Sequence, residues 1–321
     1  MVINGEKISR GESRYIEINV ARLPSHSDIN INIYVSRAKE KGPVLLLMGG
    51  MHGDEINGTE IVRRMIQTGA ATPDRGSVIC IPILNIYGFI HFSRFVPDGK
   101  DVNRSFPGNR HGSLAARIAN YLMKEIIPII DYGVDFHTGG ADRTNYPQIR
   151  CMLRDEVNAD MARAFHAPFT LDSPYRPHSL RQAAARLGKR ILVYEGGEAS
   201  RFDQFAIKEG IAGTQRLMHR LRMRDEAGPE PEYTNLIIHR AGWIRAKKSG
   251  IFQTAVKYGQ YVEKKEIVGY ITDPFGESST PIKSPAKGYI IGHNNNPLLH
   301  QGDAIIHLAL LDDSNAGIEG M

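Results

Sequence analysis

The sequence predicts an α/β protein in which helices flank a mostly parallel mixed sheet, followed by a smaller all-β domain. Three observations support this fold class. Short apolar runs alternate with helical patterns from residue 44 to residue 224, the order expected around a mostly parallel sheet. Residues 227–232 contain two prolines and no large apolar residue, which is typical of a linker. Beyond them, residues 237–310 show short strand patterns with turns and almost no helical periodicity.

The elements of the first domain follow one another in a regular order. Apolar or alternating runs predict strands, and apolar residues spaced three and four apart predict helices. The predicted strands cover residues 15–20, 29–35, 44–48, 77–84, 133–136 and 190–194, and the predicted helices cover 58–67, 114–127, 180–187 and 205–224.

The length of 321 residues exceeds what one hydrophobic core usually holds. We therefore expect an α/β domain at residues 1–226, a linker at 227–232 and an all-β barrel or sandwich at 233–312. The polar residues 313–321 are expected to form a flexible tail.

Composition and charge exclude several classes of protein. The net charge of +5 is small for the length and is not gathered into one run, so no nucleic-acid partner is expected. Cys80 and Cys151 lack the spacing of a disulfide framework or a sulfur-rich zinc site, which favours a reducing, cytoplasmic location. The N-terminus has no apolar signal core and no run approaches the ~20 apolar residues of a membrane span, so no membrane partner is expected.

Three residues form a candidate zinc site. His52 and Glu55 follow the strand at 44–48, three residues apart at the opening of a helix, and can reach one ion. Without other evidence, this pair is equally typical of an ordinary helix start, because an acidic residue in the first turn interacts favourably with the helix dipole. His137 ends another apolar strand, and the carboxyl ends of parallel strands lie at one edge of a sheet. Two histidines and one carboxylate with an open fourth position are the pattern of catalytic zinc.

Other carboxylates lie beside these residues in the predicted sheet. Glu195 follows the buried strand at 190–194 and is placed to take a proton from zinc-bound water. Glu198 is a rival for that role, but it is expected to lie beyond the strand end and to be exposed. Asp135 points to the same face as His137 and either orients that ligand or is an ordinary strand-end aspartate.

A loop at residues 94–108, rich in Pro, Gly and charge, supplies candidate substrate-binding residues. The amide of Asn103 and the planar guanidinium of Arg104 can both donate hydrogen bonds to a carboxylate. Arg94 is a cation that can face negative charge developing on a carbonyl oxygen. Without the metal residues nearby, each arginine would be interpreted as a surface side chain.

Four motifs in this order resemble the succinylglutamate desuccinylase/aspartoacylase family, relatives of the zinc carboxypeptidases. They are His52-Gly-Asp-Glu55, Asp101-Val-Asn-Arg104, Asp135-Phe-His137 and Tyr194-Glu-Gly-Gly197. The resemblance covers residues 44–224, and the C-terminal part is similar to the barrel-sandwich domain of the bacterial deacylase-like branch.

The resemblance implies a role for each candidate residue. It implies one zinc ion per chain, held by His52, Glu55 and His137, with Glu195 as general base and proton shuttle. It further implies that Arg94 polarises the scissile carbonyl, that Asn103 and Arg104 hold the α-carboxylate of the substrate, and that Arg181 is a further substrate-binding arginine.

These inferences together predict a zinc-dependent amidohydrolase that removes a short acyl group from the nitrogen of an amino acid or a related small amine. The expected partner is a small N-acyl amino acid, and a homo-oligomer is expected. The first alternative is a zinc carboxypeptidase or amidase acting on a peptide-like substrate, because the metal chemistry would be the same. The second is a non-catalytic binding protein on the same fold.

Overall fold

The computed structural model describes residues 1–22 and 25–311. The predicted tail at 313–321 lies outside this range. The α-helices are α1 (Ile56–Gln67), α2 (Ile86–Ile90), α3 (Leu114–Tyr121), α4 (Glu156–Phe165), α5 (Leu180–Arg186) and α6 (Gln204–Arg220). The irregular helical turns are the 3-10 segments η1 (Val102–Arg104) and η3 (Ile127–Ile129) and the π-helical segment η2 (Leu122–Ile126). No helix among these residues is both long and apolar enough to cross a membrane.

Helix starts follow from local sequence. Helices α3, α4, α5 and α6 each begin after a serine or aspartate whose side chain accepts a hydrogen bond from a backbone N–H of the first turn; these residues are Ser113, Asp155, Ser179 and Asp203. Such caps satisfy N–H groups that have no partner within the helix.

Two predicted helices are shorter than expected. The segment predicted at 114–127 is α-helical only to Tyr121, and it continues as a π turn and a 3-10 turn that contains Pro128. The segment predicted to reach residue 224 ends at Arg220, because Arg222 has a φ of 56° and the Met223 N–H bonds back to the Met218 carbonyl oxygen. A left-handed residue with this return hydrogen bond ends a helix.

Most strands belong to one large mixed sheet, whose main path is β12-β19-β17-β8-β10-β7-β5-β6-β4-β3. Its strands are β3 (Ser13–Arg22), β4 (Asp28–Arg37), β5 (Glu40–Met48), β6 (Arg75–Ile81), β7 (Tyr132–Gly139), β8 (Arg143–Cys151), β9 (Phe169–Asp172), β10 (Arg190–Glu198), β11 (Leu236–Ile238), β12 (Arg240–Arg245), β14 (Tyr261–Val262), β17 (Gly288–Asn294) and β19 (Ala304–Leu310). A second sheet contains β13 (Gly250–Thr254), β15 (Ile267–Thr272), β16 (Ser279–Lys283) and β18 (Leu298–Leu299), and β1 (Val2–Ile3) pairs with β2 (Glu6–Lys7).

Parallel pairing is confined to part of the large sheet. Strands β6, β5, β7 and β10 are parallel neighbours, as are β8, β9 and β11. The other pairs along the main path are antiparallel. The sheet is therefore mixed, and its parallel centre carries the ends of β5, β7 and β10 to one edge.

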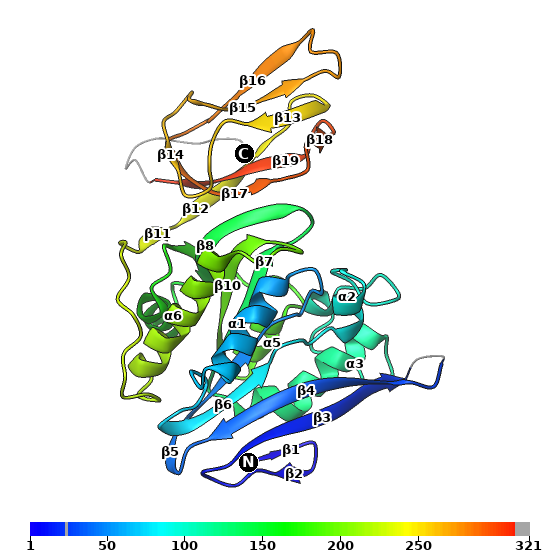
Figure 1. The fold of residues 1–321 in the computed structure, drawn as a ribbon, viewed down its shortest axis with the longest axis vertical. Coiled ribbons are helices and arrows are strands. Elements are labelled where there is room, and N and C mark those ends of the chain that lie inside the picture. The colour runs from blue at the N-terminus through cyan, green and yellow to red at the C-terminus, as the bar shows by residue number, and fades with distance from the viewer. Residues whose placement is uncertain (23–24, 312–321) are drawn as a thin grey trace.

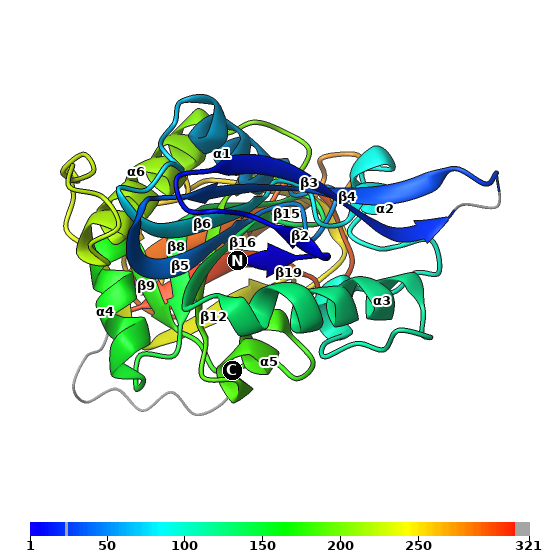
Figure 2. The same ribbon diagram turned by 90° about the horizontal axis from the view of Figure 1, so that it is seen from below.

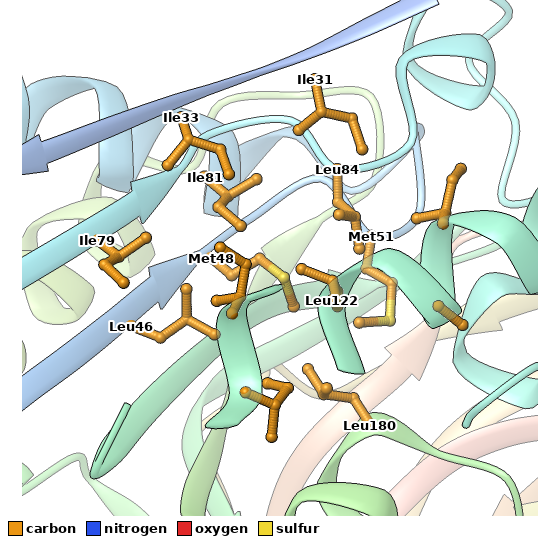
Figure 3. Close-up of a cluster of buried hydrophobic side chains, with 14 of the residues drawn as sticks. Ile31, Ile33, Leu46, Met48, Met51, Ile79, Ile81, Leu84, Leu122 and Leu180 are labelled. Carbon is orange, nitrogen blue, oxygen red and sulfur yellow. The ribbon is translucent and has the colours of Figure 1, made fainter. Parts of the chain in front are cut away.

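The two faces of the parallel centre are packed separately. Leu46 and Met48 of β5 belong to a cluster with α3, η2 and α5, which Figure 3 shows in close-up. Leu45 and Leu47, one position away, belong to a cluster with α1, α4 and α6. Because successive side chains of a strand point to opposite faces, one continuous apolar run fills both clusters. Figure 2 shows α1 and α6 on one side of the strands and α3 and α5 on the other.

The C-terminal region joins the first part of the chain through backbone pairing. From residue 236 to residue 310 it contains strands and no helix. It has a hydrophobic cluster of its own, which includes Val262, Val268 and Ile271. Strand β17 nevertheless pairs with β8, so the large sheet passes from the α/β region into the C-terminal strands at the top of Figure 1.

The segment from residue 143 to residue 172 was not assigned from sequence. It forms β8, α4 and β9, and β8 lies in the middle of the sheet. Strand β8 contains Pro147 and several polar residues, so neither strand alternation nor a continuous apolar run marks it.

Candidate metal and catalytic site

The three candidate metal ligands are brought together by neighbouring strands. His52 lies in the turn after β5, and Glu55 is the residue before the first turn of α1. Strand β7 carries His137 and pairs in parallel with β5, with Met48 opposite Asp135. Both strands therefore end at the same edge, and the turn after β5 reaches across to β7.

These side chains form a compact, buried group. The Nδ1 atom of His52 lies 2.8 Å from Glu55 Oε1, and the Nδ1 atom of His137 lies 2.8 Å from Glu55 Oε2. One donor atom from each residue fits within a set whose members are all within 4.8 Å of one another. His52 and Glu55 are each 2% exposed and His137 is 5% exposed, so water is almost excluded.

Each imidazole is also held by an outer carboxylate. The Nε2 atom of His52 lies 3.1 Å from Asp101 Oδ1, and the Nε2 atom of His137 lies 2.9 Å from Asp135 Oδ2. A carboxylate behind the histidine fixes the ring orientation and leaves the other nitrogen to face a metal ion. We call His52, Glu55, His137, Asp101 and Asp135 the donor floor.

The charges of the donor floor fit a cation. Burial disfavours charged His137, but Asp135 and Glu55 outweigh burial and hold its pKa well above the ordinary value. Burial likewise acts against charged Glu55, yet His52 and His137 keep the pKa of that carboxyl well below its usual range. Three carboxylates thus surround two imidazoles, and a divalent cation can replace the protons shared between them. Gly140 leaves the space open, since a Cβ there would lie 2.8 Å from Glu55 Oε1.

Glu195 lies on β10, the parallel neighbour of β7, with its Cα opposite that of His137. Its Oε2 atom accepts a hydrogen bond of 2.9 Å from Asn145 Nδ2, and its Oε1 atom lies 3.8 Å from Arg150 Nε. The sequence predicted that Glu198 lies beyond the strand end and is exposed. Instead, Glu198 is the last residue of β10, and its side chain is only 30% exposed. Glu198 faces Arg201 and does not line the cavity described below.

Arg94 contacts the donor floor directly. Its Nε and Nη2 atoms donate to Asp101 Oδ2 at 3.0 and 2.8 Å, and its Nη1 atom donates to Glu55 Oε1 at 3.3 Å. The guanidinium therefore anchors the carboxylate behind His52, and its side chain stays 29% exposed.

The candidate substrate-binding residues line the same space. Asn103 is fixed by its Oδ1 atom, which accepts from the Leu180 N–H at 3.0 Å, and Arg104 Nη1 donates to the Asn103 carbonyl oxygen. Arg181 is buried and donates to Pro174 O at 2.8 Å, while its guanidinium lies 5.3 Å from the centre of the Tyr175 ring.

One cavity of about 350 Å³ unites these groups. All nine residues singled out from sequence line it: His52, Glu55, Arg94, Asn103, Arg104, Asp135, His137, Arg181 and Glu195. It is lined as well by Arg143, Asn145, Arg150, Ser173, Arg176 and Trp243. The volume falls within the range of pockets for small molecules.

Five arginines line the cavity in addition to Arg94. We call Arg104, Arg143, Arg150, Arg176 and Arg181 the arginine wall. Within the described ranges, only Arg150 of this set has a carboxylate at ion-pair distance, and that carboxylate is Glu195. Uncompensated guanidinium groups in a small cavity favour an anionic ligand.

Sequence reasoning missed several residues of this site. Asp101 stood in a recognised motif, Asp101-Val-Asn-Arg104, but was given no role. Asn145 and Arg150 lie on the unassigned strand β8, and no local pattern marks them. Trp243 comes from β12 in the C-terminal region, where it stacks on His307 with 4.6 Å between ring centres. The Arg143 guanidinium lies 5.5 Å from its ring centre.

Comparison with known proteins adds an independent observation. The profile of a family described as "Succinylglutamate desuccinylase/Aspartoacylase catalytic domain" matches residues 41–221, which is more than half of the chain. A relative, the N-alpha-acetyl-L-2,4-diaminobutyric acid deacetylase of Halomonas elongata, is 27% identical over 292 residues, covering 85% of this chain and 84% of the relative.

Solved structures with the same fold cover nearly the whole chain. The product-bound ectoine utilization protein EutE (DoeB) from Ruegeria pomeroyi superposes with a TM-score of 0.83 at 20% identity, covering 93% of this chain and 95% of that one. A succinylglutamate desuccinylase/aspartoacylase from Rhodobacter sphaeroides gives a TM-score of 0.79 at 24% identity, covering 92% and 94%. At these identities the likeness concerns the fold.

Proposed function

The chain belongs to the succinylglutamate desuccinylase/aspartoacylase family, and from this premise we propose that it is a zinc-dependent amidohydrolase. It removes a short acyl group, of acetyl or succinyl type, from the nitrogen of an amino acid or a related small amine. The observation that carries this proposal is the convergence of His52, Glu55 and His137, with Glu195 on the adjacent strand in the same cavity.

The donor set favours zinc over other common ions. Two imidazoles and one carboxylate, with an open position on the cavity side, are the usual protein ligands of a catalytic zinc. Bound there, zinc supplies Lewis-acid polarisation of water and of the acyl carbonyl oxygen.

Glu195 moves the proton. Its carboxylate takes a proton from the attacking water, whose oxygen adds to the acyl carbonyl carbon. The same carboxyl then gives the proton to the amine nitrogen as the C–N bond breaks. The products are a short carboxylate and a free amine, and Glu195 returns to its starting state.

The remaining candidates orient the substrate and stabilise charge. Arg94 faces the donor floor and stabilises negative charge on the carbonyl oxygen. Asn103 and Arg104 hold the α-carboxylate of the amino acid. Arg181 is a further cation for a substrate carboxylate, a role supported by its lack of an ion-pair partner among the described residues.

The arginine wall supports a substrate with carboxylate groups. The relative from Halomonas elongata is named for the deacetylation of an N-acetylated amino acid, and this chemistry fits the cavity volume. A panel of N-acetyl and N-succinyl amino acids, with acetate, succinate and free amine as detected products, would identify the acyl group. Peptides with a free C-terminus belong in the same panel, because release of their last residue would favour a carboxypeptidase instead.

The central test is Glu195→Gln with zinc content measured in parallel. We expect zinc to remain bound and kcat to fall by about 10²–10⁴-fold, since an amide cannot take the proton. Glu198→Gln is the matched control, because it makes the same change on the same strand outside the cavity, and it should retain activity. A Glu195→Gln enzyme with most of its rate would contradict the proposal, and absence of hydrolysis and of bound zinc in the unaltered protein would favour a binding role.

We further propose that residues 1–226 form the catalytic domain, with a linker at 227–232 and an all-β domain at 233–312. A hydrophobic cluster confined to the C-terminal region supports this division. A further cluster, of Phe169 and Leu171 with Ile238, Ile291 and Ala309, lies where the two parts meet. Cys80 and Cys151 are buried and unbridged, which is compatible with a cytoplasmic location.

A further inference from the structure

Asn145 is hydrogen-bonded to the Glu195 carboxylate. Its amide nitrogen donates to Glu195 Oε2 at 2.9 Å, and its side chain is 6% exposed. An amide can donate this hydrogen bond but cannot take the proton that Glu195 carries. One carboxylate oxygen is therefore held, while the other faces Arg150 at 3.8 Å.

A bulge in β8 gives Asn145 this orientation. Glu195 is opposite Gln148 and Gly197 is opposite Asn145, so β8 has one more residue than β10 between these pairs. The extra residue reverses the alternation of side chains, and Asn145 thus lines the same cavity as Arg150, five positions along. Pro147 lies within this stretch, and proline in a central strand is tolerated at a bulge.

The C-terminal region supports Asn145 from the other side. Strand β17 pairs with β8, and Gly292 is the residue opposite Asn145. A Cβ at Gly292 would lie 2.8 Å from Asn145 Oδ1 and 2.8 Å from the Thr144 carbonyl oxygen. A side chain at position 292 would therefore displace the Asn145 amide or the backbone of β8.

Two more contacts hold β8 and the C-terminal region together. Asn295 Nδ2 donates to Thr144 Oγ1 at 2.9 Å, and Gln148 Nε2 donates to the Ile291 carbonyl oxygen at 3.3 Å. These bonds lie on either side of Asn145 along β8, so the strand cannot shift at this point without breaking them.

We propose that Asn145 is a positioning residue for Glu195 and that strand β17, through Gly292, makes the C-terminal region part of the catalytic apparatus. This inference rests on the proposed role of Glu195 as general base. It predicts that changes in a strand remote from the metal ligands alter turnover while substrate and zinc binding stay the same.

The first experiment is Asn145→Leu, which keeps the approximate shape of the side chain, removes the donor and adds no charge beside Glu195. Loss of a hydrogen bond to a charged group predicts a fall in kcat of about tenfold to a hundredfold, with KM and zinc content unchanged within about twofold. The same substitution is then made in Glu195→Gln enzyme. If Asn145 acts through Glu195, it lowers the residual rate no further there.

The second experiment is Gly292→Ala, with Gly276→Ala as control. Gly276 lies in the turn between β15 and β16, where a Cβ meets no atom within 4 Å but a φ of 76° disfavours alanine. Both substitutions are expected to destabilise the protein, and the melting temperature of each variant measures this. Only Gly292→Ala is expected to lower kcat, by about threefold to tenfold at a temperature where both are folded, as a displaced donor weakens its hydrogen bond without abolishing it.

Each outcome bears on one part of the inference. Unchanged kcat in Asn145→Leu, or an equal fall in the Glu195→Gln background, overturns the positioning role. Unchanged kcat in Gly292→Ala, with a fall in Asn145→Leu, overturns the contribution of β17. An active Glu195→Gln enzyme instead removes the proposed function itself.

Discussion

Two buried histidines, His52 of the donor floor and His307 beside Arg150 of the arginine wall, have opposite electrostatic environments. On the donor floor, burial acts against charged His52, but Glu55 and Asp101 outweigh burial and raise its pKa. For His307, no carboxylate among the described residues offsets the burial. Burial, together with the charge of Arg150, lowers the pKa of His307 to about 3.

The pairing of buried polar atoms differs in the same way. Both nitrogens of His52 and His137 and both oxygens of Glu55 have partners on the donor floor. Three atoms of the arginine wall, Arg143 Nε, Arg150 Nε and Arg181 Nη1, have no hydrogen-bond partner among the described residues, and neither has Nδ1 of the adjacent His307. The floor thus has negative charge prepared for a cation, whereas the wall has donors left for an anion.

The largest effect is expected when a candidate metal ligand of the donor floor is removed. In His137→Ala, we expect no zinc to be bound at sub-micromolar free zinc and kcat/KM to fall by more than about 10³-fold. The reason is that one of three metal ligands is removed and Glu55 loses its contact with His137. Metal analysis and initial rates measure the two effects. His111→Ala removes an exposed histidine that does not line the cavity, and it should match the parent enzyme. Full zinc occupancy in His137→Ala would show that the ion binds elsewhere.

A wall substitution should affect substrate binding instead of metal binding. In Arg104→Met, loss of a charge-assisted contact to the α-carboxylate is expected to raise KM about tenfold to a hundredfold, with zinc content unchanged. Steady-state kinetics on the best substrate of the panel measures this. Arg110→Met changes an exposed arginine outside the cavity and should leave KM as it was. If Arg104→Met lost zinc and kept its affinity for substrate, metal binding and substrate binding would not be divided between the donor floor and the arginine wall.

The smallest effect concerns His307 and pH. Its pKa is about 3 when folded, against 6.5 for the unperturbed group, so the unfolded chain binds more protons between these values. The stability that neutral His307 contributes is therefore complete above pH 6.5 and declines as the pH falls towards 3. Between pH 7 and 5.5 this decline amounts to about 1 kcal/mol in the free energy of unfolding.

The measurement is urea unfolding of the parent and of His307→Gln at both pH values. The variant should lose about 1 kcal/mol less than the parent, because glutamine does not titrate there. His300→Gln, at an exposed position, should behave as the parent does. An identical pH dependence in the parent and in His307→Gln would show that His307 does not stay neutral in the folded protein.

Much of the α/β region follows from local sequence. The run at 44–48 predicts a buried strand, and its alternate residues fill the two clusters that cover the sheet. The candidate donors were found because polar residues followed such runs directly, at the edge where parallel strands end. The pairing of β8 with β17 left no such signal, because it is made by backbone groups that every sequence supplies.

The sequence specifies which side chains are available and where many of the strands and helices lie, with β8, α4 and β9 as exceptions. Short-range periodicity and the chemistry of His52, Glu55, His137 and Glu195 carry that information. The partners of these groups, including Asp101 behind His52 and Asn145 beside Glu195, are set by the tertiary structure. These contacts join residues 49 and 50 positions apart. Asp101 reaches His52 from a loop, whereas the contact of Asn145 with Glu195 depends on the register of β8 and β10 and on a single bulge. A one-residue change of register turns a side chain to the opposite face of the sheet, so local patterns cannot specify such pairs.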